Sequence, residues 1–133
     1  MPTDFMGEGR TQYLDGSRGS VPFYLNAAVE GSNDGGAVMN KTDTDDLFCS
    51  VVIPMGYKAT DVMIYDESDN RPITVYESDI DSVTSTSMGT GNANTEFSIT
   101  DTTATTTNYL VIKYDVQATN DRIFGGYIII ERV

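Results

Sequence analysis

The sequence predicts an all-β protein, specifically an antiparallel two-sheet β-sandwich. Apolar residues alternate with polar ones, or form short runs of roughly four to eight, as they do in strands. Clusters rich in Gly, Asp, Asn and Pro separate these runs at intervals of about ten residues, a spacing typical of a sandwich. No segment has the 3.6-residue apolar period of a helix, so we expect minimal helix content.

About eight segments qualify as strands, which suits a two-sheet sandwich and allows a jelly roll. In chain order they are residues 21–30, 37–40, 47–54, 60–67, 73–80, 96–100, 109–118 and 122–132. The first begins near Pro22, as an edge strand often does, and the third is apolar on both faces and ends at Pro54. Residues 31–36 (GSNDGG) and 68–72 (SDNRP) are predicted turns. Residues 37–40 would form a short strand that pairs with the first.

Residues 109–133 carry the strongest strand signal. Residues 109–118 alternate between an apolar and a more polar row, so one row can face a core. A short polar link, residues 119–121, precedes the second run, which makes an antiparallel hairpin the simplest prediction. Three consecutive isoleucines, residues 128–130, predict a strand inside the fold, covered on both faces. Gly125-Gly126 predicts a bulge or a close backbone approach.

Residues 81–108 are dominated by threonine and serine, and only residues 96–100 (EFSIT) form a clear strand signal. Because threonine favours strands, part of this region could be a sheet edge with its hydroxyls facing water, and the remainder should be surface loops. Gly89 and Gly91 form a GxG, but the rest of a dinucleotide-binding fingerprint is missing. The region offers no aromatic anchor for a ligand.

Residues 1–20 are expected to form an extended N-terminal arm, and residues 21–133 the sandwich domain. The arm is rich in Gly, Ser and charge and cannot bury enough surface to offset its ordering entropy. Its apolar side chains suggest ordering against a neighbouring subunit, and a frayed terminus is the alternative. The candidate anchors are Phe5, Met6, Tyr13 and Leu14.

The formal net charge is −12, from 8 basic and 20 acidic residues. The basic residues are scattered, so we expect no nucleic-acid partner. The acidity favours solubility, or docking on a basic partner. There is no long apolar run for a membrane span, and no basic-then-apolar leader at the N-terminus. We therefore expect synthesis in a cytoplasm and no membrane association.

The chain contains no histidine, which removes the commonest general base and transition-metal ligand. Serine–histidine and cysteine–histidine hydrolases and histidine-ligated zinc sites are excluded. The single cysteine, Cys49, has apolar neighbours and is expected to pack as a small hydrophobe rather than act as a nucleophile. Aspartate and glutamate pairs could serve a glycosidase, but nothing singles out two of them. We identify no catalytic or cofactor-binding residue and expect no enzyme.

Closely spaced acidic residues invite comparison with calcium loops, because hard cations take carboxylate ligands. Asp43, Asp45 and Asp46 resemble the start of such a loop but lack the glycine and distal glutamate of an EF-hand. The favoured interpretation is an acidic loop tip, and the same holds for Asp79 and Asp81. No metal site is predicted.

Three segments stand out within the layout of an arm followed by a small β-sandwich: residues 51–67 (VVIPMGYKATDVMIYDE), 94–102 (NTEFSITDT) and 108–133 (NYLVIKYDVQATNDRIFGGYIIIERV). On these segments the chain resembles small virion accessory proteins of tailed bacteriophages, of the head-decoration or cement type. The resemblance implies a non-enzymatic protein that binds the major capsid protein or other virion subunits and stabilises the head lattice. It also implies synthesis in a host cytoplasm and a homo-oligomer, with a trimer favoured.

Two alternatives remain open at the level of sequence. The chain could be a carbohydrate- or calcium-binding β-sandwich module. Sugar sites usually stack on large aromatic faces, and there is no tryptophan here, but eight tyrosines could substitute. It could also be a tail or neck component rather than a head protein.

Overall fold

The computed structural model describes residues 12–13, 17–24, 31–34, 37–40, 46–67, 69–118 and 121–133. The strands are β1 (Gln12–Tyr13), β2 (Arg18–Tyr24), β3 (Gly31–Asp34), β4 (Ala37–Asn40), β5 (Leu47–Val51), β6 (Tyr57–Asp66), β7 (Pro72–Asp79), β8 (Ser85–Asn92), β9 (Phe97–Thr103), β10 (Asn108–Tyr114) and β11 (Arg122–Arg132). Within these ranges all pairing is antiparallel, and no helix is present, let alone one that could cross a membrane. The all-β prediction is confirmed.

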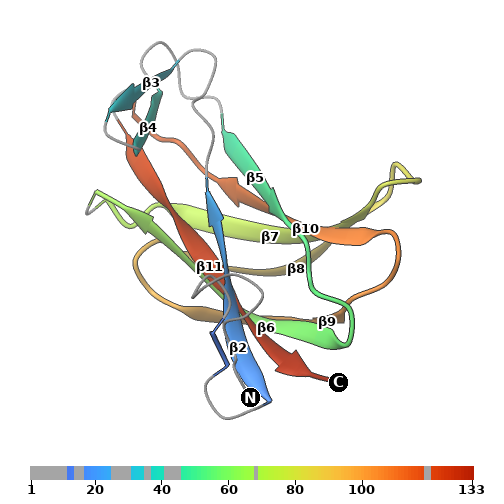
Figure 1. Cartoon of the computed structure of the whole chain (residues 1–133). Coiled ribbons are helices and arrows are strands. Elements are labelled where there is room, and N and C mark those ends of the chain that lie inside the picture. The colour runs from blue at the N-terminus through green and yellow to red at the C-terminus, as the bar shows by residue number, and fades with distance from the viewer. Residues whose placement is uncertain are drawn as a thin grey trace.

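Two sheets pack face to face (Figure 1). One contains β2, β11, β6 and β9 in that order, with β1 at the edge of β2 and the β3–β4 hairpin beside the start of β11. The other has the order β5-β10-β7-β8. The pairs β7–β8, β6–β9, β5–β10 and β2–β11 nest inside one another along the chain and fall alternately in the two sheets. This nested pairing is that of a jelly roll, so the predicted two-sheet sandwich is confirmed.

The predicted hairpin between β10 and β11 is wrong, because the two strands belong to opposite sheets. β10 pairs with β5 and β7, whereas β11 pairs with β2, β4 and β6. The polar link between them is therefore an arch that crosses from one sheet to the other. The alternation in β10 is as predicted: Leu110, Ile112 and Tyr114 are buried, and the intervening side chains are partly exposed.

β11 lies in the middle of its sheet, between β2 and β6. Ile128, Ile129 and Ile130 are all buried, which confirms that this segment of the strand lies inside the fold rather than at an edge. The register with β6 shifts between Ile123 and Gly125, so a bulge lies directly before the glycine pair. A Cβ atom on Gly126 would overlap the carbonyl oxygen of Met63. Both the predicted bulge and the predicted close approach are present.

Several element boundaries differ from those predicted. β8 (Ser85–Asn92) was not predicted as a separate strand, although its place at the sheet edge and its mostly exposed side chains fit the expected hydroxyl-bearing edge. Residues 31–34 form β3 rather than a turn, and β4 pairs with β3 and β11 rather than with β2. β2 begins at Arg18, before the expected domain boundary, and residues 1–11 lie outside the described part of the chain.

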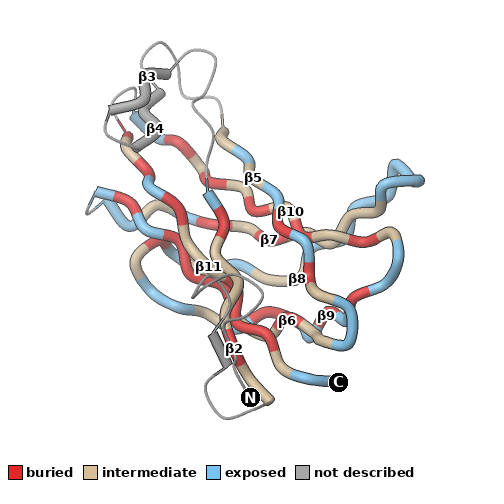
Figure 2. Tube along the Cα trace, in the orientation of Figure 1, coloured by how far each residue is buried: buried red, intermediate tan, exposed pale blue. Residues whose placement is uncertain are grey.

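The hydrophobic core fills the space between the sheets, and buried residues alternate along the strands that face it (Figure 2). Its largest fully buried side chains are Tyr114, Ile64, Ile73, Leu110, Ile112, Ile123, Ile128 and Ile130. Met63 and Ile129 are also buried but lie outside this cluster, because strand alternation points them to the opposite face of their sheet. That outer face is therefore apolar near its centre.

Candidate functional site

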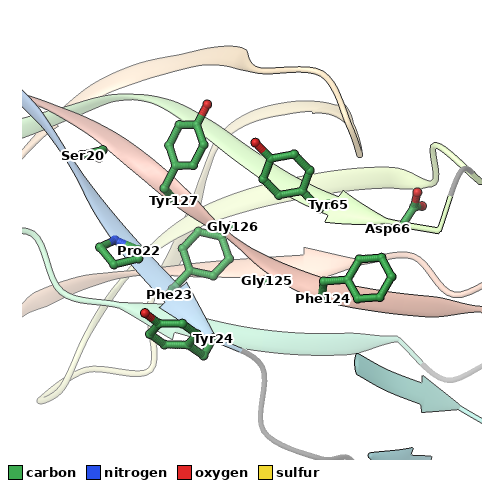
Figure 3. Close-up of a pocket in the computed structure, with 10 residues that line it drawn as sticks. All are labelled: Ser20, Pro22, Phe23, Tyr24, Tyr65, Asp66, Phe124, Gly125, Gly126 and Tyr127. Atoms are coloured by element: carbon green, nitrogen blue, oxygen red, sulfur yellow. The ribbon is translucent and has the colours of Figure 1, made fainter. Parts of the chain in front are cut away.

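An aromatic groove of about 650 Å³ lies on the outer face of the sheet that contains β2, β11 and β6 (Figure 3). Its walls are side chains of Tyr24 from β2, Tyr65 from β6, and Phe124 and Tyr127 from β11. The remaining lining residues are Ser20, Pro22, Phe23, Asp66, Gly125 and Gly126. We refer to this feature as the aromatic groove.

Strand register brings these residues together. Gly125 of β11 lies opposite Tyr24 on one side and Tyr65 on the other, and Tyr127 lies opposite Pro22 and Met63. Directly opposed residues in a sheet point to the same face, so the tyrosines share the outer surface. The rings of Tyr65 and Tyr127 stand 6.4 Å apart between centroids, at an interplanar angle of 54°. The walls are thus fixed by the sheet.

The glycine pair leaves the backbone of β11 bare between the aromatic walls. Gly125 has a φ of +149°, and a Cβ atom there would lie 3.0 Å from the carbonyl oxygen of Phe23. Gly126 allows β11 to approach the backbone of β6. Neither residue places a side chain over the groove. Directly between Tyr24 and Tyr65, at Gly125, the groove therefore has no side chain from β11.

One wall residue is held by a carboxylate. The hydroxyl of Tyr127 donates to Oε1 of Glu96 at 2.9 Å. Burial and this hydrogen bond raise the pKa of Tyr127 to about 12, so the phenol stays neutral at physiological pH. By contrast, Tyr24, Tyr65 and Phe124 have exposed fractions of 59%, 43% and 43%. The groove thus combines exposed ring faces with a hydrogen-bonded polar margin.

A second surface lies at the end of the sandwich where the β5–β6, β7–β8 and β9–β10 loops meet. Val52 and Ile80 line a hollow of about 480 Å³ there, together with Thr105, Thr106 and Thr107. Large aliphatic side chains on these loops face solvent: the exposed fractions are 69% for Val52, 64% for Met55, 74% for Ile80 and 104% for Val83. We call this surface the aliphatic loop end. Its protruding β7–β8 tip is visible at the right of Figure 1.

Asp66 is the last residue of β6 and lies at the end of the sandwich opposite the aliphatic loop end. There it connects the two sheets. Its carboxylate accepts hydrogen bonds from the hydroxyl of Tyr114 on β10, from the side-chain amide of Asn94, and from the backbone N–H groups of residues 69, 70 and 71. Burial and the bond to Asp66 raise the pKa of Tyr114. Asp66 is engaged in holding loops and sheets together, so its role is structural.

Asp121 organises the arch between β10 and β11. Its side chain is 2% exposed. The carboxylate accepts hydrogen bonds from Nε (2.9 Å) and Nη2 (2.7 Å) of Arg71 and from the backbone N–H groups of Gln117 and Ala118. Burial alone raises the pKa of Asp121, but the bonds from Arg71 and the two amides outweigh it, and the net shift is downward. This carboxylate therefore stabilises the fold in its charged form.

We expect the contribution of Asp121 to stability to depend on pH. Because its folded pKa is lowered, the contribution is fully present above the unfolded pKa of about 3.9 and is lost as pH falls through the folded pKa. Asp121→Asn should lower the free energy of unfolding by about 2 kcal/mol at pH 7 and by less at pH 2.5. Urea denaturation at both pH values measures this. Asp101→Asn, in an exposed pair with Lys58, should cost under about 1 kcal/mol. An Asp121→Asn deficit that is equal at both pH values would contradict the prediction.

Most of the predicted arm and acidic-loop residues cannot be placed. Phe5, Met6, Leu14, Asp43 and Asp45 lie outside the described residues, and Tyr13 belongs to β1, of which only the strand pairing is described. Asp46 forms an ion pair with Lys113 at 3.8 Å, and its pKa is raised by burial and by repulsion from Asp115. The described residues contain no cluster of three potential metal ligands.

The other singled-out residues have local structural roles. Asp79 accepts a hydrogen bond from the hydroxyl of Thr107, and Asp81 is exposed. Cys49 is half-buried against the core, and burial raises the pKa of its thiol to about 12. Gly91 leaves room for the ring of Phe97, which occupies the place where a Cβ would stand. The second glycine of the GxG is therefore explained by packing.

Sequence reasoning missed the aromatic groove, because its wall residues are far apart in the chain. One signal was available: Phe23-Tyr24 is a pair of consecutive aromatics in a predicted strand, so one ring must face outward. Comparison with known proteins adds no assignment, since neither a protein-family model nor a curated protein matches the chain.

Proposed function

We propose that the protein is a non-enzymatic structural component of a virion, a decoration or cement protein that binds the capsid and stabilises the head lattice. The observation that carries this proposal is the aliphatic loop end, where Val52 and Ile80 line one hollow and Met55 and Val83 are exposed on the same two loops. Grouped exposed apolar side chains mark protein interaction sites. Fully burying one such side chain stabilises a complex by about 1.5 kcal/mol or more.

Fold, composition and resemblance support the same function. Jelly rolls are frequent in viral capsid domains, although the fold alone does not determine function. The net charge of −12 disfavours a nucleic-acid partner and is compatible with a basic protein surface. The partner would be the major capsid protein or another virion subunit, contacted by the aliphatic loop end and by the arm. The protein would be made in the host cytoplasm and bind as a homo-oligomer, with a trimer favoured.

The proposal is tested by adding the purified protein to virus particles whose own copy of the gene is deleted. Wild-type protein should bind to the heads, seen by immunogold electron microscopy and quantified from gel bands. Ile80→Ser/Val83→Ser should bind at least tenfold more weakly, which corresponds to about 1.4 kcal/mol. Tyr24→Ala, in the aromatic groove, is the matched control and should leave occupancy unchanged.

Three results would overturn the proposal: no label on particles, label confined to tails or necks, or full occupancy by the double serine variant. Label on a tail or neck would point instead to a component of that structure. Light scattering on the purified protein tests the oligomeric state separately, and a monomer would contradict the trimer.

A further inference from the structure

We propose that the aromatic groove binds an uncharged saccharide chain. This function goes beyond capsid attachment and uses a different face of the molecule. The groove lies on the outer face of the sheet, whereas the aliphatic loop end is formed by the β5–β6, β7–β8 and β9–β10 loops. A virion protein could therefore hold its lattice through one surface and contact a glycan through the other.

The exposed aromatic rings of the groove support a saccharide ligand. Tyr24, Tyr65 and Phe124 come from three neighbouring strands and expose between two-fifths and three-fifths of their surface (Figure 3). A sugar ring presents a face of C–H groups that can lie against an aromatic face, while its hydroxyls stay at the edge. Gly125 and Gly126 line the groove between these walls and add no side chain to it.

The aromatic character of the exposed apolar side chains in the groove also supports a saccharide ligand. All large exposed apolar side chains that line the groove are aromatic, apart from the ring of Pro22. The exposed aliphatic side chains Val52, Met55, Ile80 and Val83 lie on the opposite loops, and Val133 lies at the C-terminus. Phe48, on β5 of the other sheet, is the one exposed aromatic side chain of the described residues outside the groove. Exposed aromatic side chains are thus concentrated at the groove. Flat rings with polar tips suit a ligand that is itself part apolar and part hydroxylated.

The negative charge around the groove favours an uncharged ligand over an anionic one. Glu96 holds the hydroxyl of Tyr127, Asp66 lines the groove, and Glu67 follows Asp66 in the chain. The nearby cation Arg122 lies 3.8 Å from Glu67 and is thereby partly neutralised. Sugar hydroxyls can donate to an exposed carboxylate such as that of Glu96, whereas the carboxylate of Asp66 is occupied by its own hydrogen bonds and contributes only its charge. A polyanionic saccharide would be repelled by them and by the net charge of −12.

Affinity electrophoresis of the full-length protein tests this proposal. The gels contain one of four neutral polysaccharides (hydroxyethyl cellulose, mannan, galactomannan or glycol chitin) or the polyanion alginate. At least one neutral polymer should retard the wild-type protein, and alginate should not. Tyr65→Ala and Phe124→Ala should weaken retardation at least tenfold, whereas Tyr65→Phe should retain it because the ring is kept.

Val83→Ser, at the aliphatic loop end, is the matched control and should bind like the wild type. Circular dichroism and melting curves establish that each variant is folded. The proposal is overturned if none of the four neutral polymers retards the protein, if alginate binds better than all of them, or if the alanine variants are retarded like the wild type. Capsid occupancy is measured independently, so failure of one function leaves the other standing.

Discussion

Replacing Gly126 with alanine is expected to cost about 4 kcal/mol or more in free energy of unfolding, enough to abolish cooperative unfolding in a marginal domain. The added Cβ atom would overlap the carbonyl oxygen of Met63 and lie 2.8 Å from the Cα atom of Ile64. Both obstacles are backbone of the neighbouring strand, which cannot rotate away as a side chain can. β11 and β6 would have to separate at the centre of their sheet. Urea denaturation followed by circular dichroism measures the loss.

Gly56→Ala is the matched control. Gly56 lies in a turn with a φ of +89°, and beyond its two chain neighbours no atom lies within 4 Å of the place that its Cβ would take. Only the cost of the left-handed conformation remains, about 1 kcal/mol. If Gly126→Ala proves no more costly than Gly56→Ala, the close approach of β11 to β6 does not limit that position.

Replacing Asp66 with alanine is expected to cost about 3 kcal/mol. The carboxylate accepts five hydrogen bonds, from the β6–β7 turn, from Asn94 and from Tyr114. Alanine would leave the buried hydroxyl of Tyr114 without this acceptor and would release the turn. Because β6 and β10 belong to opposite sheets, the variant also removes a link across the sandwich. Thermal and urea unfolding both report the change.

Tyr114→Phe separates the contributions, since it removes only the hydroxyl and keeps the ring in the core. It should cost about 1 kcal/mol. Asp69→Ala, at an exposed neighbouring position, should be nearly neutral. Equal losses from Asp66→Ala and Tyr114→Phe would mean that the turn does not depend on the carboxylate.

The local patterns of the sequence predicted local structure well. The alternation in β10, the burial of the isoleucine triplet and the bulge at Gly125-Gly126 each follow from a few adjacent residues. β8 was missed because its serines, threonines and glycines carry no apolar signal. Its conformation is imposed by pairing with β7, so it depends on a neighbour rather than on its own residues.

Connectivity between sheets could not be predicted from local patterns. A polar link after an alternating strand is the same signal whether the chain turns back beside itself or crosses to the opposite sheet. The arch is stabilised by contacts of Asp121 with Arg71, a residue remote in sequence. The aromatic groove has the same origin, because register alone brings Tyr24, Tyr65 and Phe124 together.

The nested order of the strands has a consequence for biosynthesis. β2, near the start of the chain, completes its pairing only with β11, which is also the partner that β6 needs. While the ribosome is still making β11, both strands have an open edge and exposed apolar faces. Closure of this sheet must therefore wait until synthesis has passed residue 132, and folding is dominated by contacts between distant segments, which form slowly. During that interval the nascent chain is exposed to aggregation and would benefit from chaperone protection.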